Sequence, residues 1–193
     1  QSLPVPGMVI RGLFVLGEQT LAVGMTRSSN RPTLFHLTEE GPERIEGQPR
    51  LSNEAVNPAG WTHDGRVLWT ISEDRRGADG IRWVGGSQKF GWGTATFPSA
   101  GRLHGLASRP GQLMGWENGQ IFRWGGTAGK ARRTVVDACG GPDGFYLLQK
   151  DHIQLWTEKD QPMEWALLPK GWTGIGMSMR PSGLPLVHMR GRD

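Results

Sequence analysis

Residues that could hold a metal ion are present but poorly spaced for it. Metal-binding histidines usually include a local pair a few residues apart, because both rings then reach one ion. No two histidines of this chain lie three or four residues apart. The five are His36, His63, His104, His152 and His188. The sequence therefore predicts no local metal site, and we expect no cofactor.

A nucleophile with a neighbouring base is the next arrangement that could do chemistry. Cys139 is the only cysteine, so the chain cannot form an internal disulfide. A pair between Cys139 and His104 from the preceding repeat is sterically conceivable. Free cysteine is more often a small buried residue, and a Gly-x-Ser-x-Gly motif is absent. We therefore expect no enzymatic nucleophile.

Acidic residues argue against a glycoside hydrolase, which needs two carboxylates at its reaction centre. Asp137 is the acid that we place on an inner strand. Asp64 and Asp143 belong to tight turns, where Asp stabilises the bend. Because one carboxylate is found where a pair is needed, a hydrolase is the least favoured of the functions considered.

The net charge of the chain and the length of its apolar stretches limit the kinds of partner and surface that it can bind. The net charge of +4 permits an anionic partner without demanding one. The basic residues are scattered and form no run of five, so we expect no specific nucleic-acid binding. The longest apolar stretches have four or five residues, so we expect no membrane span. A chain that begins with Gln1 fits a removed signal peptide or a trimmed chain, which favours an extracytoplasmic protein without fixing the compartment.

An all-β framework must position these few groups. Apolar residues make up 36% of the chain, and 30 glycines and 13 prolines are dispersed between short apolar runs, as turn residues would be. Nine tryptophans argue against disorder, because disordered segments lack large apolar side chains.

A unit of about forty residues repeats along this framework. Its first mark is a turn followed by Ile and Trp, clearest in "ENGQIFRWGG" (117–126) and repeated in segments 78–86 and 150–158, with a weaker copy in 31–39. Its second mark is a turn glycine between two strand-like runs, at successive spacings of 48, 46, 33 and 39 residues. These glycines are Gly17, Gly65, Gly111, Gly144 and Gly183.

The tryptophans of the first mark are expected to be packing residues. Trp83, Trp124 and Trp156 would pack between neighbouring units, where aromatic side chains bury the most area. Trp124→Ala would then lower the free energy of unfolding by about 3 kcal/mol or more. Asn118-Gly119 in the same segment predicts a type I′ bend.

Each unit reads as four short antiparallel strands, which is the pattern of a β-propeller blade. Glycines on the first strand fit an innermost position, where backbones approach closely. The outermost strands are expected at 89–97, 132–138 and 164–169. We thus predict an all-β, single-domain β-propeller over residues 1–193, with units at 8–50, 51–100, 101–137, 138–170 and 171–193 plus 1–7.

The blade number is expected to be five, with four full units and one split blade. Residues 171–190 supply two strands, and "SLPVPG" (2–7) could close that blade from the N-terminus and so avoid an open edge. The alternative is a fragment of a larger propeller.

The repeats also resemble known propeller families. The segment "GWTHDGRVLWTISEDRRGADGIRWV" (60–84) resembles the TolB-type repeat, and "GPDGFYLL" and "RPSGLPLV" repeat its turn. "NGQIFRWGG" is similar to the Asp-box/BNR and photosystem-assembly-factor type of repeat, although the Asp-box itself is absent. The resemblance covers nearly the whole chain and implies the architecture, but it implies no particular activity.

These observations favour a monomeric, non-catalytic propeller that binds a protein partner and serves as an interaction or assembly scaffold. The alternative is a carbohydrate-binding, lectin-like propeller with Trp61, Trp92, Trp116 or Trp172 stacking on sugar rings. If the inner strands align as expected, the binding residues form a mixed ring. They are Arg11, Trp61, His104, Asp137 and Trp172.

Overall fold

The computed structural model describes residues 7–26, 29–84, 89–98, 100–126, 128–157 and 162–191. Within them the chain forms four antiparallel sheets of four strands each and one two-stranded hairpin. In every four-stranded sheet, neighbours in the chain are also neighbours in the sheet. The all-β expectation is therefore confirmed.

The strands follow in simple order. The first sheet contains β1 (Met8–Leu16), β2 (Gln19–Thr26), β3 (Ser29–Thr38) and β4 (Gly41–Arg44). The second contains β5 (Trp61–His63), β6 (Val67–Ile71), β7 (Gly77–Val84) and β8 (Lys89–Thr96). The third contains β9 (Gly105–Arg109), β10 (Gln112–Glu117), β11 (Gln120–Arg123) and β12 (Ala128–Lys130). The fourth contains β13 (Asp137–Gly140), β14 (Phe145–Leu148), β15 (His152–Trp156) and β16 (Pro162–Leu167). The hairpin contains β17 (Trp172–Met179) and β18 (Pro185–Gly191), and two short 3-10 helices, η1 (Asn53–Val56) and η2 (Pro58–Gly60), link the first two sheets.

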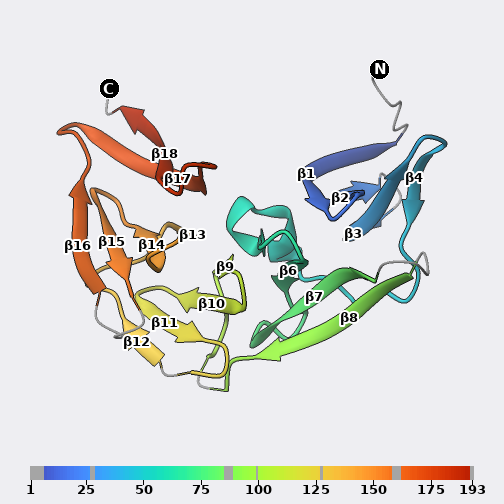
Figure 1. Cartoon of the computed structure of the whole chain (residues 1–193), viewed down its shortest axis with the longest axis horizontal. Coiled ribbons are helices and arrows are strands. Elements are labelled where there is room, and N and C mark those ends of the chain that lie inside the picture. The colour runs from blue at the N-terminus through green and yellow to red at the C-terminus, as the bar shows by residue number, and fades with distance from the viewer. Residues whose placement is uncertain are drawn as a thin grey trace.

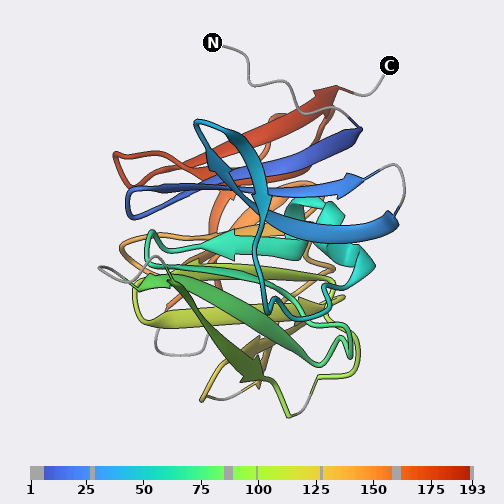
Figure 2. The ribbon, with the colours of Figure 1, turned by 90° about the vertical axis from the view of Figure 1, so that its right-hand side faces the viewer.

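The five sheets follow one another around an arc that is open between β1 and the β17–β18 hairpin (Figure 1). β9, β13 and β17 lie toward the middle of the arc (Figure 1), and β5, β9, β13 and β17 make successive contacts with one another. β1 and β18 lie at the same end of the molecule in the perpendicular view (Figure 2). Residues 2–7, which we expected to close a split blade, fall largely outside the described residues.

The hydrophobic core lies between the sheets. Leu16 and Leu21 of the first sheet pack with Leu68 and Ile81 of the second, which forms one such cluster. The next cluster joins the second and third sheets, and another, with Trp116 and Trp156 nearly fully buried, joins the third and fourth. A last cluster joins the fourth sheet to the hairpin. Each sheet is thus held by apolar contact with its neighbours in the chain.

The turn glycines adopt the backbone conformation that their position requires. All five predicted ones have positive φ: 62° at Gly17, 84° at Gly65, 74° at Gly111, 154° at Gly144 and 81° at Gly183. L-residues with a side chain rarely adopt such angles, so Gly is the residue that closes these turns without strain. At Asn118-Gly119 the prediction is wrong in detail, because Asn118 has a φ of 54° while Gly119 does not have positive φ. A type I′ bend needs positive φ at both residues.

Two further expectations are corrected. Segment 132–138 is not the outermost strand of the third sheet, because β12 occupies that place and Asp137 already begins the next inner strand. Trp124 follows β11 in a turn, and 46% of its surface is exposed although its ring lies 5.5 Å from that of Trp69. Trp156, in contrast, is fully buried.

A charged cluster joins the η1 segment to the later sheets. Glu54 accepts hydrogen bonds from the Ser52 hydroxyl (2.5 Å) and from the Arg102 guanidinium, and Arg75 lies 3.6 Å away. Burial by itself raises the pKa of Glu54, but these donors outweigh it and lower the pKa from 4.5 to about 2. Glu54 therefore ties the linker after the first sheet to residues just before β7 and β9.

The burial of the two tryptophans gives the first prediction. Trp156→Ala should lower the free energy of unfolding by about 3–5 kcal/mol, the usual loss for a buried aromatic side chain. Trp124→Ala should lower it by only about 1 kcal/mol, because roughly half of that side chain is already in water. Urea denaturation followed by circular dichroism measures both values, and equal losses would contradict this assignment.

The Glu54 cluster gives a pH prediction. Because folding lowers the pKa of Glu54, its contribution to stability is full above pH 4.5 and is lost as the pH falls toward about 2. Glu54→Gln should flatten the decline in stability over that window, measured by urea denaturation at several pH values. The matched control is Glu40→Gln, an exposed residue in a turn, which should leave the decline unchanged. An unchanged decline in Glu54→Gln would refute the role of the cluster.

Candidate functional site

The inner strands line one pocket of about 330 Å³ near the middle of the arc, called the central pocket below. It receives residues from β5, β9, β13 and β17, so four successive sheets contribute to it. Its lining includes Trp61, Thr62, His63, Ser108, Asp137, Cys139 and Met177.

Two hydroxyls connect the strands on one side of this pocket. The Thr62 and Ser108 hydroxyl oxygens lie 3.0 Å apart, and the backbone N–H of Ser108 donates to the Thr62 oxygen (3.0 Å). These bonds join β5 to β9 across a boundary between sheets. They also place two groups that can donate and accept hydrogen bonds on the pocket lining.

Asp137 is the one acidic residue among those that line the central pocket. Its Oδ2 accepts a hydrogen bond from the backbone N–H of Met177 on β17 (2.7 Å), and its Oδ1 accepts one from Ala138 (2.9 Å). Burial raises its pKa, and although these two amides and nearby His188 act in the opposite direction, the pKa stays above the ordinary value. No Lys or Arg of the described chain forms an ion pair with it within 4.0 Å.

Cys139 and His63 line the same pocket, and burial shifts the pKa of both side chains. Burial, with a smaller effect of Asp137, raises the pKa of the Cys139 thiol to about 12. The reactive thiolate is therefore scarce at neutral pH. Burial also lowers the pKa of His63, which favours a neutral imidazole.

Trp61 bridges the first sheet and the central pocket. Its ring meets that of Phe14 edge to face, with centroids 4.4 Å apart. Its indole N–H is buried and has no acceptor among the described residues. Since Trp61 is half-buried, one part of the side chain packs against β1 while another lines the pocket.

The structure brings together two of the five residues expected in a ring. Trp61 and Asp137 line the central pocket, whereas Arg11, His104 and Trp172 do not. Arg11 lies at a bulge of β1 with its side chain exposed, and His104 precedes β9, where its Nδ1 accepts from the backbone of Asn118 (3.3 Å). Trp172 begins β17 and is 45% exposed.

Sequence reasoning missed Thr62 and Ser108. Each lies within a repeat whose turn the sequence predicts. Thr62 directly follows Trp61, and Ser108 lies three residues before Gly111. Small hydroxyl residues on strands are common, so the sequence carried no signal that these two meet across sheets. Trp116, one of the sugar platforms named for the lectin-like alternative, is 1% exposed and belongs to the core.

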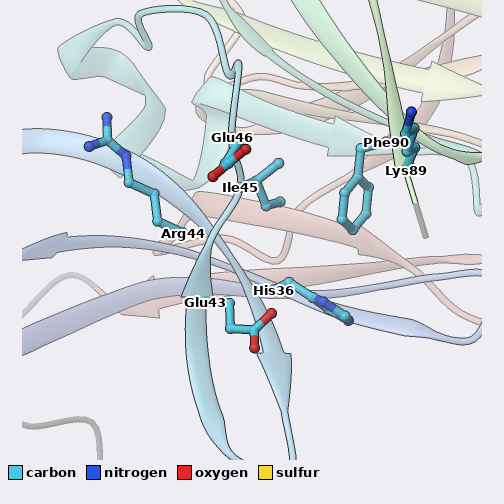
Figure 3. Close-up of a pocket in the computed structure, with 7 residues that line it drawn as sticks. All are labelled: His36, Glu43, Arg44, Ile45, Glu46, Lys89 and Phe90. Carbon is cyan, nitrogen blue, oxygen red and sulfur yellow. The ribbon is translucent and has the colours of Figure 1, made fainter.

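A second pocket, of about 320 Å³, lies between the outer strands of the first two sheets and is called the rim pocket below (Figure 3). His36 and Glu43 are opposite each other on β3 and β4, and Phe90 of β8 lies across from them. The His36 ring lies 5.7 Å from Phe90 and 6.2 Å from Trp83. In Figure 3 the His36 and Glu43 side chains reach into the space between the sheets, whereas Arg44 is directed away.

Within the described residues, no three His, Cys, Asp or Glu side chains gather as metal ligands. The described part of the chain also contains no helix with the length and apolar character needed to span a membrane.

Comparison with known proteins identifies the architecture. No protein-family model and no curated protein sequence matches this chain. Among solved structures, a streptogramin B lyase matches with a TM-score of 0.63 and 17% identity, over 96% of this chain and 63% of that one. The fold is that of a β-propeller.

Two further structures support the same fold. A catalytically inactive variant of virginiamycin B lyase from Staphylococcus aureus, with quinupristin, matches with a TM-score of 0.57 and 14% identity, over 96% of this chain and 71% of that one. The extracellular domain of a hybrid two-component system from B. thetaiotaomicron matches with a TM-score of 0.57 and 9% identity, over 93% and 25%. The sheets described above are therefore called blades below.

Proposed function

We propose that this chain is a non-catalytic β-propeller that binds a segment of a partner protein at the central pocket. In this proposal a basic side chain of the partner reaches Asp137. The observation that carries it is a buried carboxylate that has backbone donors and no Lys or Arg ion-pair partner in the described chain. A cation placed beside such a carboxylate gains a charge-assisted hydrogen bond in a site where water competes weakly.

The rest of the central pocket suits a peptide. The Thr62 and Ser108 hydroxyls can bond to backbone amides, and Trp61 and Met177 offer apolar surface. The high thiol pKa of Cys139 and the single carboxylate favour binding over acyl transfer or glycoside hydrolysis. We keep the TolB-type likeness of the repeats as part of this proposal, because its turn glycines Gly65, Gly144 and Gly183 have positive φ. The Asp-box/BNR-type likeness of 118–126 is kept on its sequence alone.

The lyase activity named for two of the matched structures does not enter the proposal. The identity of 14–17% supports a shared fold, and this chain spans 63% of the streptogramin B lyase structure. Function within one fold is decided by the residues of the site.

A pair of model peptides tests this function. One is a five-residue, blocked peptide of glycine and serine with a central arginine, and the other carries neutral citrulline in its place. The arginine peptide should bind and shift the NMR signals of the Ala138 and Met177 amides, which donate to Asp137. Asp137→Asn should weaken binding about tenfold or more, since a hydrogen bond to a charged group contributes about 1.5–3 kcal/mol.

The controls separate this site from general charge attraction. Glu18→Gln removes an acidic residue of the β1–β2 turn, outside the pocket lining, and should leave the affinity unchanged. Binding should also weaken as the pH falls through the raised pKa of Asp137. Equal binding of the citrulline peptide, or no binding of either, would refute the proposal. The same variants then serve as baits for the natural partner.

Carbohydrate binding is a second candidate, and the rim pocket favours it. Phe90 and His36 present ring faces on which a sugar can stack, and Glu43 supplies an acceptor for hydroxyl groups.

Glycan-array binding followed by calorimetry tests that candidate. Glu43→Gln and Phe90→Ala should each weaken binding of a retained sugar about tenfold, because each removes one recognition contact. Trp172→Ala, which alters an exposed aromatic residue of β17 that does not line the rim pocket, should have no effect. If no glycan is retained, or if only the Trp172 variant loses binding, the rim pocket is not a sugar site.

A further inference from the structure

The last sheet covers only part of the blade beside it. β17 and β18 form a two-stranded sheet, whereas the preceding blade has four strands. Met177 and Val187 of the hairpin pack against Cys139, Tyr146 and Leu155 on the face of that blade. This is an established apolar interface, since Met177, Tyr146 and Leu155 are each no more than 8% exposed.

The same face continues outward onto β16, where it is open to solvent. Met163 pairs with Leu155, a member of the covered cluster, yet Met163 itself is 53% exposed. Trp165 meets the ring of Tyr146 edge to face at 5.1 Å and is 42% exposed. Met163 and Trp165 therefore form an apolar shelf that is continuous with the covered interface.

β18 is the outer strand of the hairpin, and its Val187 packs on the cluster that contains Leu155, the residue paired with Met163 of the shelf. Among the described residues, β18 pairs with β17 and with no second strand. Exposed edges are usually blunted by lysines, prolines or inward-pointing charges. In β18 the only proline is Pro185 at its first position and the only charged residue is Arg190 near its end, so the four residues Leu186, Val187, His188 and Met189 present a regular edge.

We propose that an extended segment of a partner protein adds to β18 as a further strand and packs apolar side chains on the shelf. The backbone of the segment would complete the hydrogen bonds of β18, as in other cases of strand addition. Because side chains alternate between the two faces of a strand, every second residue of the segment must be apolar to reach Met163 and Trp165. The occupant is thus a strand of alternating apolar and polar residues. This site is separate from the central pocket and does not depend on the function proposed above.

A labelled peptide tests strand addition on the full chain. The probe is an eight-residue peptide of alternating valine and threonine with a lysine at each end, and its control carries N-methyl groups on every second amide. Fluorescence anisotropy should show binding of the probe and not of the methylated control, because methylation removes the donors along one edge. Trp165→Ser together with Met163→Ser should weaken binding at least tenfold. Both side chains are about half exposed, and Met163→Ser alone serves as the milder variant if the pair disturbs folding.

A control variant away from the shelf, and tests for other occupants of the β18 edge, accompany this measurement. Val84→Ser changes an apolar residue of β7, in the second blade, that is 40% exposed, and should leave binding unchanged. Equal binding of the methylated peptide, no binding of the probe, or no effect of the shelf variants would overturn the proposal. Sedimentation showing a dimer that the shelf variants abolish would assign the surface to a second copy. Binding of the probe only after residues 1–6 are deleted would assign it to the N-terminal segment of this chain. Either result overturns the proposal of a partner segment.

Discussion

The close approach of the inner strands is the constraint on which the rest of this structure depends. A Cβ atom added at Gly140 would lie 2.1 Å from the carbonyl oxygen of Ser108 in the preceding blade. On the other side of β9, Ser108 donates its backbone N–H to Thr62 at 3.0 Å. The strands can meet in this way because their contact positions carry glycine or small hydroxyl residues. The same closeness brings Thr62, Ser108 and Asp137 from three blades to one pocket.

The repeated framework could be predicted from the sequence because the features that define each repeat are local in the chain. A turn glycine between two strand-like runs reports a backbone angle at one residue, and Gly17, Gly65, Gly111, Gly144 and Gly183 all have positive φ. The position of Trp156 could be read in the same way, since a large apolar residue on a third strand has a neighbouring blade to pack against.

What escaped prediction depends on contacts between distant segments. Trp124 matches Trp156 in the repeat pattern, but β11 ends at Arg123, so the side chain of Trp124 leaves the sheet in a turn. The central pocket shows the same limit, because the meeting of Thr62 with Ser108 spans 46 residues and leaves no pattern in the chain. Of the expected ring, Asp137 and Trp61 lie on inner strands and reach the pocket, whereas His104 lies before its strand begins.

One hydrogen bond links the β17–β18 hairpin to the central pocket. Asp137 of the fourth blade accepts a hydrogen bond from the backbone N–H of Met177 in the β17–β18 hairpin (2.7 Å). In repeat architectures each unit is stabilised mainly by contacts with its neighbours. When the hairpin opens, Asp137 loses a backbone donor and the central pocket loses one wall. A ligand bound in the central pocket, as proposed above, would therefore couple occupation of the pocket to the ordering of β17 and β18.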